Sequence, residues 1–564
     1  MAIPRSLVAA LGVLLGAAAL MPAWGDAGGP IPAAPTSQAT ASQVDAGRRM
    51  YMEGVLPTGE RMTGIVQGDI PLAGEQVICG RCHRRSGFGA PEGQNVAPPV
   101  VADILYNSVR LPTSKPPLAP ELRPAYTNET LKRAIREGVG STGKPLGPLM
   151  PRYPLDDAQL DTLIGYLNTL SRSPDPGVTE QDIHFATVIA GPVDPGASKA
   201  FLDVFHTYFE QKNRETRHET FRSEHAPWHE AWTMKPYRKW VLHLWELQGE
   251  PDSWAEQLRA HYEAHPVFAV ISGLAAGPWE PIHHFCESNG VPCILPVTDL
   301  PFVNEADFYT VYFNRGMALE ADTIAEHLKG EQGSQGPVIQ VYRVSDERAR
   351  EAAAQLRRRL QANGTMVTDF AFESAVTDQA FWQGFVEQSA GADAVLWLGP
   401  DALLGLWGAW RPSDSTGPDR VYLSTSLFGI DAGTLPADLW QQVYLVHPSE
   451  LPSQLPQLLA RSAGWLTTRR IAAPGAEQIQ ANAFLALKMA GEAAMRIRGF
   501  FNRDYLLERM ENMAENALYT SIYPRVSLAP GQRFLSKGAY IAQFAAQEGG
   551  NLTAVTPWRI PAFK

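Results

Sequence analysis

Apolar and polar positions alternate with two periods along the last two thirds of the chain. Residues 184–190 form a β-rich apolar run, and residues 196–214 carry an apolar stripe through Phe201 and Phe205 on one face of a helix. Further strands are expected at 240–247, 267–271, 293–297, 338–344, 366–372, 394–398 and 421–427, and further helices at 253–265, 279–288, 346–362, 379–390 and 481–494. Short apolar strands separated by amphipathic helices predict parallel sheets covered on both faces. Because there are too many units for one compact sheet, we expect two α/β lobes over 183–564.

The part of the chain before these lobes differs in charge and ends at a proline-rich break. Residues 44–172 hold 15 Lys and Arg against 13 Asp and Glu, whereas the 392 residues that follow carry a net charge of −13. Pro174 and Pro176 cannot continue the helix expected before them, so we place a linker at 173–182. We therefore expect a multidomain protein. Its overall net charge of −11 argues against a nucleic-acid partner.

The first 25 residues have the features of a secretory signal peptide. Arg5 supplies the charged start, residues 7–20 are apolar or small, and residues 23–25 (Ala-Trp-Gly) give the small-x-small pattern of a cleavage site. Residues 26–43, rich in Ala, Pro, Gly and Ser, are expected to be a flexible tether. The apolar run is too short for a membrane span, and no later stretch approaches 18 apolar residues. These features predict an exported, periplasmic protein whose mature form has no membrane span.

The most specific motif in the sequence is Cys79-Gly-Arg-Cys82-His83. Two thiols three residues apart can bond covalently to the two vinyl groups of one haem, and the adjacent His83 then reaches the iron. A zinc site would need a second pair of ligands, and none lies nearby. Dithiol exchange would call for a strand-to-helix setting instead. Since the motif occurs once, we expect one haem c, attached at Cys79 and Cys82 with His83 as an axial ligand.

A low-spin haem needs a sixth ligand, for which Met150 is the candidate. It stands in a Met-Pro loop before a helical pattern at 156–170. With the CxxCH motif, a middle helix at 129–138, this loop and the last helix, the region 44–172 resembles a class I cytochrome c domain. The resemblance implies an all-α fold and assigns the distal iron ligand to Met150. Three methionines on the N-terminal side of the motif compete for this role: Met50, Met52 and Met62.

Residues 183–564 resemble the type I periplasmic binding proteins of the branched-chain amino-acid receptor kind. The matching segments are the runs 268–273 and 289–298, the crossing at 308–315, the returning helix at 481–494 and a closing hairpin of 526–531 with 538–544. The resemblance implies a two-lobed α/β fold with a small solute bound between the lobes, at the carboxyl ends of the strands. The cleft residues on matching positions are Ser272, Gly273 and Thr298. Another doubly wound α/β domain is the alternative.

Two further groups of residues bear on chemistry. Cys286 and Cys293 flank a helix end and the next strand, and export favours a disulfide between them, with buried free thiols as the alternative. A histidine-rich group contains a proline that breaks helical spacing, so we expect a solvated loop there instead of a metal site. Its members are His218, Glu219, His225, His229 and Glu230.

Three functions agree with these features. The first is a periplasmic electron-transfer protein, whose haem exchanges electrons with a redox partner such as a dehydrogenase or another cytochrome, and whose receptor-like domain binds a small solute or that partner. The second is an oxidoreductase subunit that oxidises a cleft-bound substrate and passes electrons to the haem. The third is a solute-transport receptor with a haem redox sensor. We find no cofactor motif for two-electron chemistry in the second module, so the first function is preferred and no catalytic residue is assigned.

Overall fold

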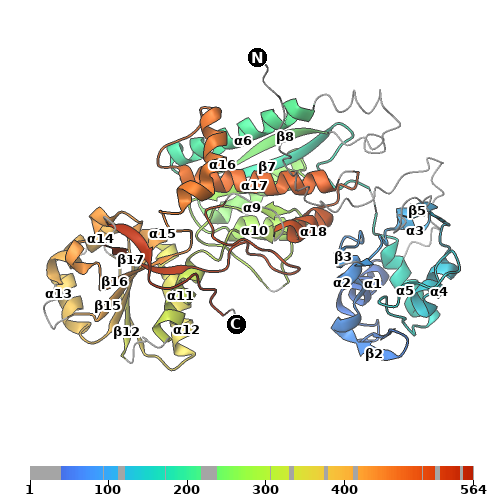
Figure 1. The fold of residues 1–564 in the computed structure, drawn as a ribbon, viewed down its shortest axis with the longest axis horizontal. Helices are drawn as coiled ribbons and strands as arrows, with labels where there is room; N and C mark the ends of the chain where they lie inside the picture. The colour runs from blue at the N-terminus through green and yellow to red at the C-terminus, as the bar shows by residue number, and fades with distance from the viewer. Residues whose placement is uncertain are drawn as a thin grey trace, which may run out of the picture. The chain divides into compact units, whose positions relative to one another are not determined.

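The computed structural model describes residues 40–92, 95–111, 121–171, 173–216, 238–304, 306–329, 336–373, 379–410, 417–497, 499–514, 521–545 and 550–562. Contacts within the chain divide these residues into two compact units, one up to Ser171 and one from residue 173 onward (Figure 1). The predicted signal peptide at 1–25 lies outside the described residues, as do residues 26–39 of the tether. Among the described residues, no helix has the length and apolar character that a membrane span requires.

The N-terminal unit contains both helices and small sheets. Its helices are α1 (Ala41–Glu53), α2 (Cys79–His83), α3 (Ala102–Leu105), α4 (Asn128–Glu137) and α5 (Asp157–Leu167). Its strands pair in antiparallel hairpins, β1 (Thr63–Val66) with β2 (Ile70–Ala73), β3 (Pro91–Glu92) with β4 (Asn95–Val96), and β5 (Val109–Leu111) with β6 (Glu121–Arg123). The expected all-α fold is therefore wrong in this respect. The long connections on both sides of α2 form these hairpins, in which backbone N–H and C=O groups of paired strands bond to each other.

The first and last helices of this unit pack closely against each other. A Cβ at Gly47 of α1 would lie 2.5 Å from the carbonyl oxygen of Thr162 and 2.7 Å from Cβ of Tyr166, both on α5. The rings of Tyr51 and Tyr166 have centroids 5.3 Å apart in the same contact. Thr40 caps α1, so residues 40–43 belong to this unit, whereas they were predicted to be the end of the flexible tether.

The segment predicted as a linker at 173–182 is largely part of the second unit. The Asp175 carboxylate accepts a hydrogen bond from the Arg503 backbone N–H at 2.6 Å, and the Arg503 guanidinium donates to the Pro176 carbonyl at 3.1 Å. A Cβ at Gly177 would lie 2.1 Å from the backbone nitrogen of Phe268. From Asp175 onward this segment is packed onto the receptor-like unit, and it is not the spacer that its prolines suggested.

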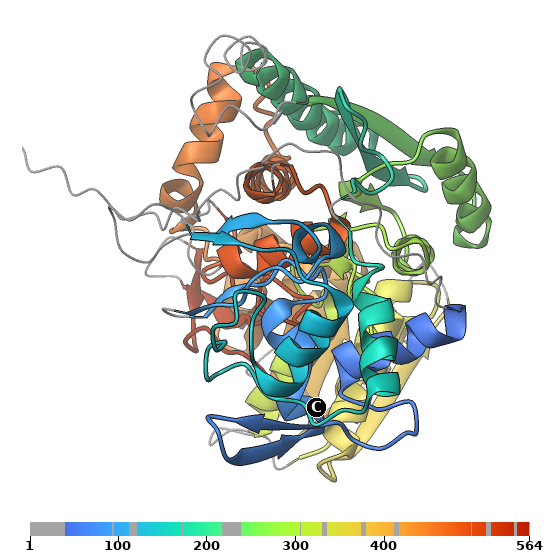
Figure 2. The same ribbon diagram turned by 90° about the vertical axis from the view of Figure 1, so that its right-hand side faces the viewer.

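The first lobe of the second unit is built on a five-stranded parallel sheet in the order β11-β10-β9-β7-β8. The strands are β7 (Asp182–Ala190), β8 (Lys239–Leu247), β9 (Ala269–Ala275), β10 (Cys293–Ile294) and β11 (Thr310–Val311). The helices are α6 (Pro195–Thr216), α9 (Trp254–Ala264), α10 (Glu280–Asn289), α16 (Leu455–Thr468), α17 (Glu477–Arg496) and α18 (Arg503–Ala514). Helix α17 runs across Figure 1 beside α6 and is seen end-on in Figure 2.

The second lobe is built on a seven-stranded sheet in the order β13-β12-β14-β15-β16-β17-β18. The strands are β12 (Val338–Arg343), β13 (Val367–Phe372), β14 (Asp393–Trp397), β15 (Arg420–Ser424), β16 (Val443–His447), β17 (Tyr540–Ala545) and β18 (Asn551–Ala554). The helices are α11 (Met317–Lys329), α12 (Glu347–Gln361), α13 (Gln379–Gln388), α14 (Pro400–Ala409) and α15 (Thr425–Phe428). In Figure 1, α11 and α12 lie on one face of this sheet and α13 and α14 on the other.

The two-lobed α/β fold was predicted, and two details of the second lobe differ. The predicted strand at 421–427 ends at Ser424, whose side chain accepts a hydrogen bond from the Leu427 backbone N–H and caps the short helix α15. The closing hairpin was predicted between 526–531 and 538–544, but residues 526–531 form no strand; β17 pairs instead with β18, and both run antiparallel to their neighbours. The chain crosses between the lobes three times, after β11, after β16 and after α18.

Candidate functional site

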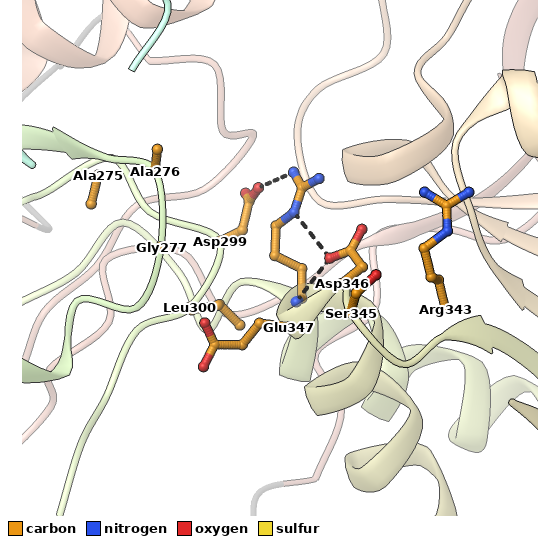
Figure 3. Close-up of a pocket in the computed structure, with 10 residues that line it drawn as sticks. Ala275, Ala276, Gly277, Asp299, Leu300, Arg343, Ser345, Asp346 and Glu347 are labelled. Atoms are coloured by element: carbon orange, nitrogen blue, oxygen red, sulfur yellow. Dashed lines mark hydrogen bonds and ion pairs between the residues drawn. The ribbon is translucent and has the colours of Figure 1, made fainter. Parts of the chain in front are cut away.

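A cavity of about 540 Å³ lies between the two lobes, where their strands end. Ala275 is the last residue of β9, and Arg343 is the last residue of β12. The first lobe contributes Ala275, Ala276, Gly277, Asp299 and Leu300, and the second contributes Arg343, Ser345, Asp346, Glu347 and Arg348. Figure 3 shows Asp299 on the side of Ala275 and Ala276, facing Asp346 across the cavity. Carboxyl ends of parallel strands are the usual ligand-binding edge of an α/β fold.

Backbone contacts fix the position of Asp299 on the first-lobe wall. The Asp299 carbonyl accepts a hydrogen bond from the Met317 backbone N–H at 3.0 Å, at the start of α11. Gly316 approaches this carbonyl so closely that a Cβ would lie 2.1 Å from the oxygen. The next residue, Leu300, donates its N–H to Thr298 Oγ1 at 3.1 Å. The carboxylate of Asp299 is thereby held at the cavity on a well-anchored turn.

The second-lobe wall is the N-terminus of α12. Asp346 caps this helix, its Oδ1 accepting hydrogen bonds from the backbone N–H groups of Arg348 at 3.1 Å and Ala349 at 3.4 Å. The Arg348 guanidinium reaches across the cavity, with Nη1 3.3 Å from Asp299 Oδ2, and its Nε is 3.6 Å from Asp346 Oδ1. One arginine therefore connects a carboxylate of each lobe (Figure 3).

Two carboxyl groups at this end of the lobes have a pKa raised above the usual range. Burial raises the pKa of Asp299, an effect that the charge and hydrogen bond of Arg348 oppose. The Asp299 side chain is 43% exposed, but that surface lines the cavity, which provides less solvation than open water. Burial also raises the pKa of Glu320, on the first turns of α11, to about 8, against hydrogen bonds from Ser424 and Ser426. Glu320 Oε2 has no hydrogen-bond partner among the described residues.

The CxxCH motif of the N-terminal unit forms the short helix α2. Cys79 and Cys82 are both half-buried and are not joined to each other. Burial raises the pKa of the Cys79 thiol to about 11. The Nδ1 of His83 lies 2.8 Å from the Pro98 carbonyl oxygen. A carbonyl can only accept, so Nδ1 carries the proton and the lone pair of the ring is on Nε2.

The loop that carries Met150 is anchored next to this motif. The Arg152 guanidinium donates to the carbonyls of Met150 and Leu146, the latter at 3.0 Å. The backbones of Arg152 and Ile65 exchange two hydrogen bonds of 2.8 Å. Tyr153, three residues after Met150, donates its hydroxyl to the Val77 carbonyl at 2.7 Å. Because Val77 directly precedes the turn into α2, these contacts hold the Met150 loop near the motif.

The three competing methionines occupy different surroundings. Met50 and Met62 have no exposed surface and are part of the apolar core of this unit. The sulfur of Met52 lies against α2, where a Cβ at Gly80 would be 2.8 Å from it. Core packing accounts for the first two, and Met52 remains the nearest competitor to Met150.

A family model described as "Periplasmic binding protein" matches residues 246–551, which is more than half of the chain. The chain belongs to the periplasmic binding protein family. No curated protein matches it.

Several solved structures of binding proteins are similar to this periplasmic binding protein. An ABC transporter substrate-binding protein from Sphaerobacter thermophilus is 13% identical, with a TM-score of 0.48 over 68% of this chain and 98% of that one. A branched-chain amino acid ABC transporter protein from Thermus thermophilus with bound valine is 13% identical, with a TM-score of 0.47 over 68% and 98%. A fatty acid ABC transporter substrate-binding protein from Thermomonospora curvata is 12% identical, with a TM-score of 0.46 over 69% and 95%.

The cleft residues predicted from the sequence lie close to the cavity of this periplasmic binding protein but do not line it. Ser272 is fully buried, and its hydroxyl donates to the Leu295 carbonyl at 2.8 Å. Gly273 is packed under Trp279, whose ring would lie 2.7 Å from a Cβ. Thr298 caps the turn that presents Asp299. Sequence analysis thus identified β9 and the residue before Asp299, but it missed the strand end at Ala275 and the charged residues that line the cavity.

The buried polar residues around α10 of this periplasmic binding protein have structural roles. Cys286 and Cys293 are free, buried thiols, and burial and a hydrogen bond with Cys293 raise the pKa of Cys286. The predicted disulfide is not formed in the structure and stays a prediction.

His283, Glu287 and Asp307 have ligand atoms within 4.8 Å of one another. Both Glu287 oxygens already accept backbone N–H groups from residues 308–310, and His283 Nε2 contacts Asp307 at 2.9 Å. This cluster ties α10 to the segment before β11.

The histidine-rich group predicted to be a solvated loop lies outside the described residues. Its members are His218, Glu219, His225, His229 and Glu230.

Proposed function

We propose that the second unit is a receptor that binds one small solute between its lobes. The observation that carries this proposal is the cavity of about 540 Å³ at the strand ends, with charged residues on both walls. Ligand sites of about 300–1,000 Å³ take molecules from amino-acid to drug size. Three chain crossings join the lobes, so the walls can move relative to each other as a ligand enters.

A bound solute stabilises the folded receptor by an amount that rises with the logarithm of its concentration above its Kd. At a hundred times its Kd, a ligand adds about 2.7 kcal/mol to the free energy of unfolding. Residues 40–171 hold no tryptophan and residues 238–562 hold eleven, so tryptophan fluorescence reports mainly the unfolding of this unit. We expect extracts of small metabolites to raise the midpoint of this transition. Unchanged unfolding with all fractions would contradict the receptor function.

For the N-terminal unit we propose one haem c, attached covalently at Cys79 and Cys82. The two thiols stand one helical turn apart on α2, and both are half-buried. Pro98 holds the His83 proton on Nδ1, which leaves the Nε2 lone pair for iron. Burial lowers the pKa of His83, which favours the neutral ring that a metal needs. These donors fit the group, which when bound would supply one-electron transfer.

We propose Met150 as the second axial ligand, since Arg152 and Tyr153 anchor its loop beside α2. A Met ligand favours ferrous haem, so Met150→Ala should lower the reduction potential and remove the near-infrared sulfur-to-iron band. Met52→Ala is the matched control, because Met52 also lies against α2. Loss of the band in the Met52 variant, with the band kept in Met150→Ala, would assign the ligand to Met52.

With both sites together, the protein is proposed to act as a solute receptor that carries a periplasmic electron-transfer haem. The haem would exchange electrons with a redox partner protein, a dehydrogenase or another cytochrome, or report the redox state to a transporter. An oxidoreductase that oxidises the cleft-bound solute is the other candidate. Adding solute to the oxidised protein with no other protein present distinguishes them. Reduction of the haem would favour the oxidoreductase, and no reduction would favour the receptor.

A further inference from the structure

The ion pair between Asp299 and Arg348 occupies the place where a solute would contact both lobes. Asp299 belongs to the first-lobe wall, and Arg348 is on the first turn of α12 in the second lobe. Their side chains meet at 3.3 Å, and each is 43% exposed within the cleft. A solute that fills the cavity has to compete with this pair, so one partner must give up the other.

The two partners differ in what happens when they lose this contact. Arginine keeps its charge at any accessible pH. Asp299 can lose its charge by taking up a proton, and burial already raises its pKa. The groups that act on Asp299 are Arg348 and Asp346 from α12, Glu320 from α11 and Tyr523 from the third crossing. Of these, only Arg348 is cationic, so its removal takes away the group that stabilises the charged form of Asp299.

The second-lobe wall is suited to hold an anion in place of Asp299. Arg343 and Arg348 both line the cavity. The N-terminus of α12, a helix of 15 residues, faces the same space, where the carboxylates of its cap, Asp346, and of Glu347 also lie. A cation would instead have to take Asp299 from Arg348, whose guanidinium would then keep only its longer contact of 3.6 Å with Asp346.

We propose that the cleft binds a small anionic solute such as a carboxylate, which displaces Asp299 from Arg348, and that Asp299 takes up a proton as it loses this contact. This inference rests on the proposed receptor function. The Asp299 carboxylate thus acts as an internal substitute for the solute, and binding of the anion is linked to pH. The charge of the cleft is unchanged by this step, because the anion brings in one negative charge and the proton neutralises the negative charge of Asp299.

The first experiment offers the full-length protein four defined mixtures: small carboxylates, zwitterionic amino acids, amines and neutral sugars. The readout is the shift of the tryptophan unfolding transition. We expect stabilisation by the carboxylates alone. Stabilisation by amines, amino acids or sugars without carboxylates would overturn the anion proposal and keep the receptor. Failure of all four would contradict the receptor function itself.

The second experiment measures the affinity of the best single carboxylate from that mixture between pH 6 and pH 8. Because binding takes up one proton, the affinity should fall by up to about tenfold for each unit by which the pH rises. In Asp299→Asn, whose side chain cannot titrate, we expect tighter binding at pH 8 and a flat pH profile. Arg348→Met should lose binding, whereas Lys199→Met, which breaks the Lys199–Asp203 pair on α6, should match the wild type. A pH-independent affinity in the wild type, or an unchanged pH profile in Asp299→Asn, would overturn the role of Asp299.

Discussion

The two units of this protein carry their candidate chemistry in opposite ways. In the N-terminal unit, three residues within one turn of α2, Cys79, Cys82 and His83, suffice to propose a cofactor. In the receptor unit, Asp299 and Arg348 are 49 residues apart and become neighbours only when two lobes fold. A candidate site built on a local motif can therefore be proposed from a sequence without its fold. A site built by tertiary packing needs the fold first.

The largest expected effect tests the local motif. Cys82→Ser removes one of the two thioether bonds, so we expect covalent haem retention to be weakened or abolished. The measurement is haem staining of denatured protein after acid–acetone treatment. Cys286→Ser is the control, because this thiol is buried in the receptor unit. Full stain in Cys82→Ser would show that the motif does not attach the haem.

A second prediction tests whether the linker belongs to the receptor unit. Gly177→Ala places a Cβ 2.1 Å from the Phe268 backbone at a φ of 91°, so it should destabilise the receptor by about 3 kcal/mol. Gly475→Ala is matched, because it has a φ of 83° with nothing within 4 Å of a Cβ. Urea unfolding followed by tryptophan fluorescence measures both. Equal effects of the two variants would mean that residue 177 is not packed on the receptor.

A third prediction applies the same logic to the N-terminal unit. Gly47→Ala should separate α1 from α5 and cost about 2 kcal/mol, since its Cβ would lie 2.5 Å from a backbone oxygen. Gly147→Ala, with open space around its Cβ, should be nearly neutral. We expect loss of helical circular dichroism at lower urea in the first variant, with the tryptophan transition unchanged. A shift of the tryptophan transition by Gly47→Ala would show that the two units do not unfold separately.

A further expected effect is a pH dependence within the receptor unit. Glu320 has its pKa raised from 4.5 to about 8 by burial, so the folded protein binds a proton that the unfolded chain has lost. The contribution of Glu320 to the free energy of unfolding is therefore fully present below about pH 4.5, and it is lost as the pH rises toward about 8. Glu320→Gln, which cannot titrate, should flatten this part of the stability profile. An unchanged profile would remove Glu320 as its source.

Much of the receptor fold was predictable because its strands and helices have clear periods. The prediction failed where single residues changed the backbone. The strand expected at 293–297 is only two residues long, because Pro296 cannot donate to a sheet and Leu295 has a φ of 55°. The linker was predicted from Pro174 and Pro176, whereas its buried partner, Arg503, is more than 300 residues away in the sequence.

The candidate cleft was predicted to within a few residues, and its composition was not. Ser272 lies within β9, three residues before the strand end at Ala275, where a ligand contact is expected. Its φ of 52° turns the residue inward, and no sequence pattern marks that conformation in a serine. Asp299 and Arg348 face each other because the three crossings set one lobe against the other. Such a pairing cannot be deduced from either segment alone.

One chain is proposed to hold both a covalently bound haem and a reversibly bound small solute. Intact-mass measurement of the protein from an exporting, haem-attaching host tests both at once, first under native and then under denaturing conditions. We predict a native mass that exceeds the mature polypeptide by one haem and one small molecule. After denaturation, only the haem should remain. A haem that leaves on denaturation, or a mass equal to the polypeptide alone in both conditions, would contradict the account.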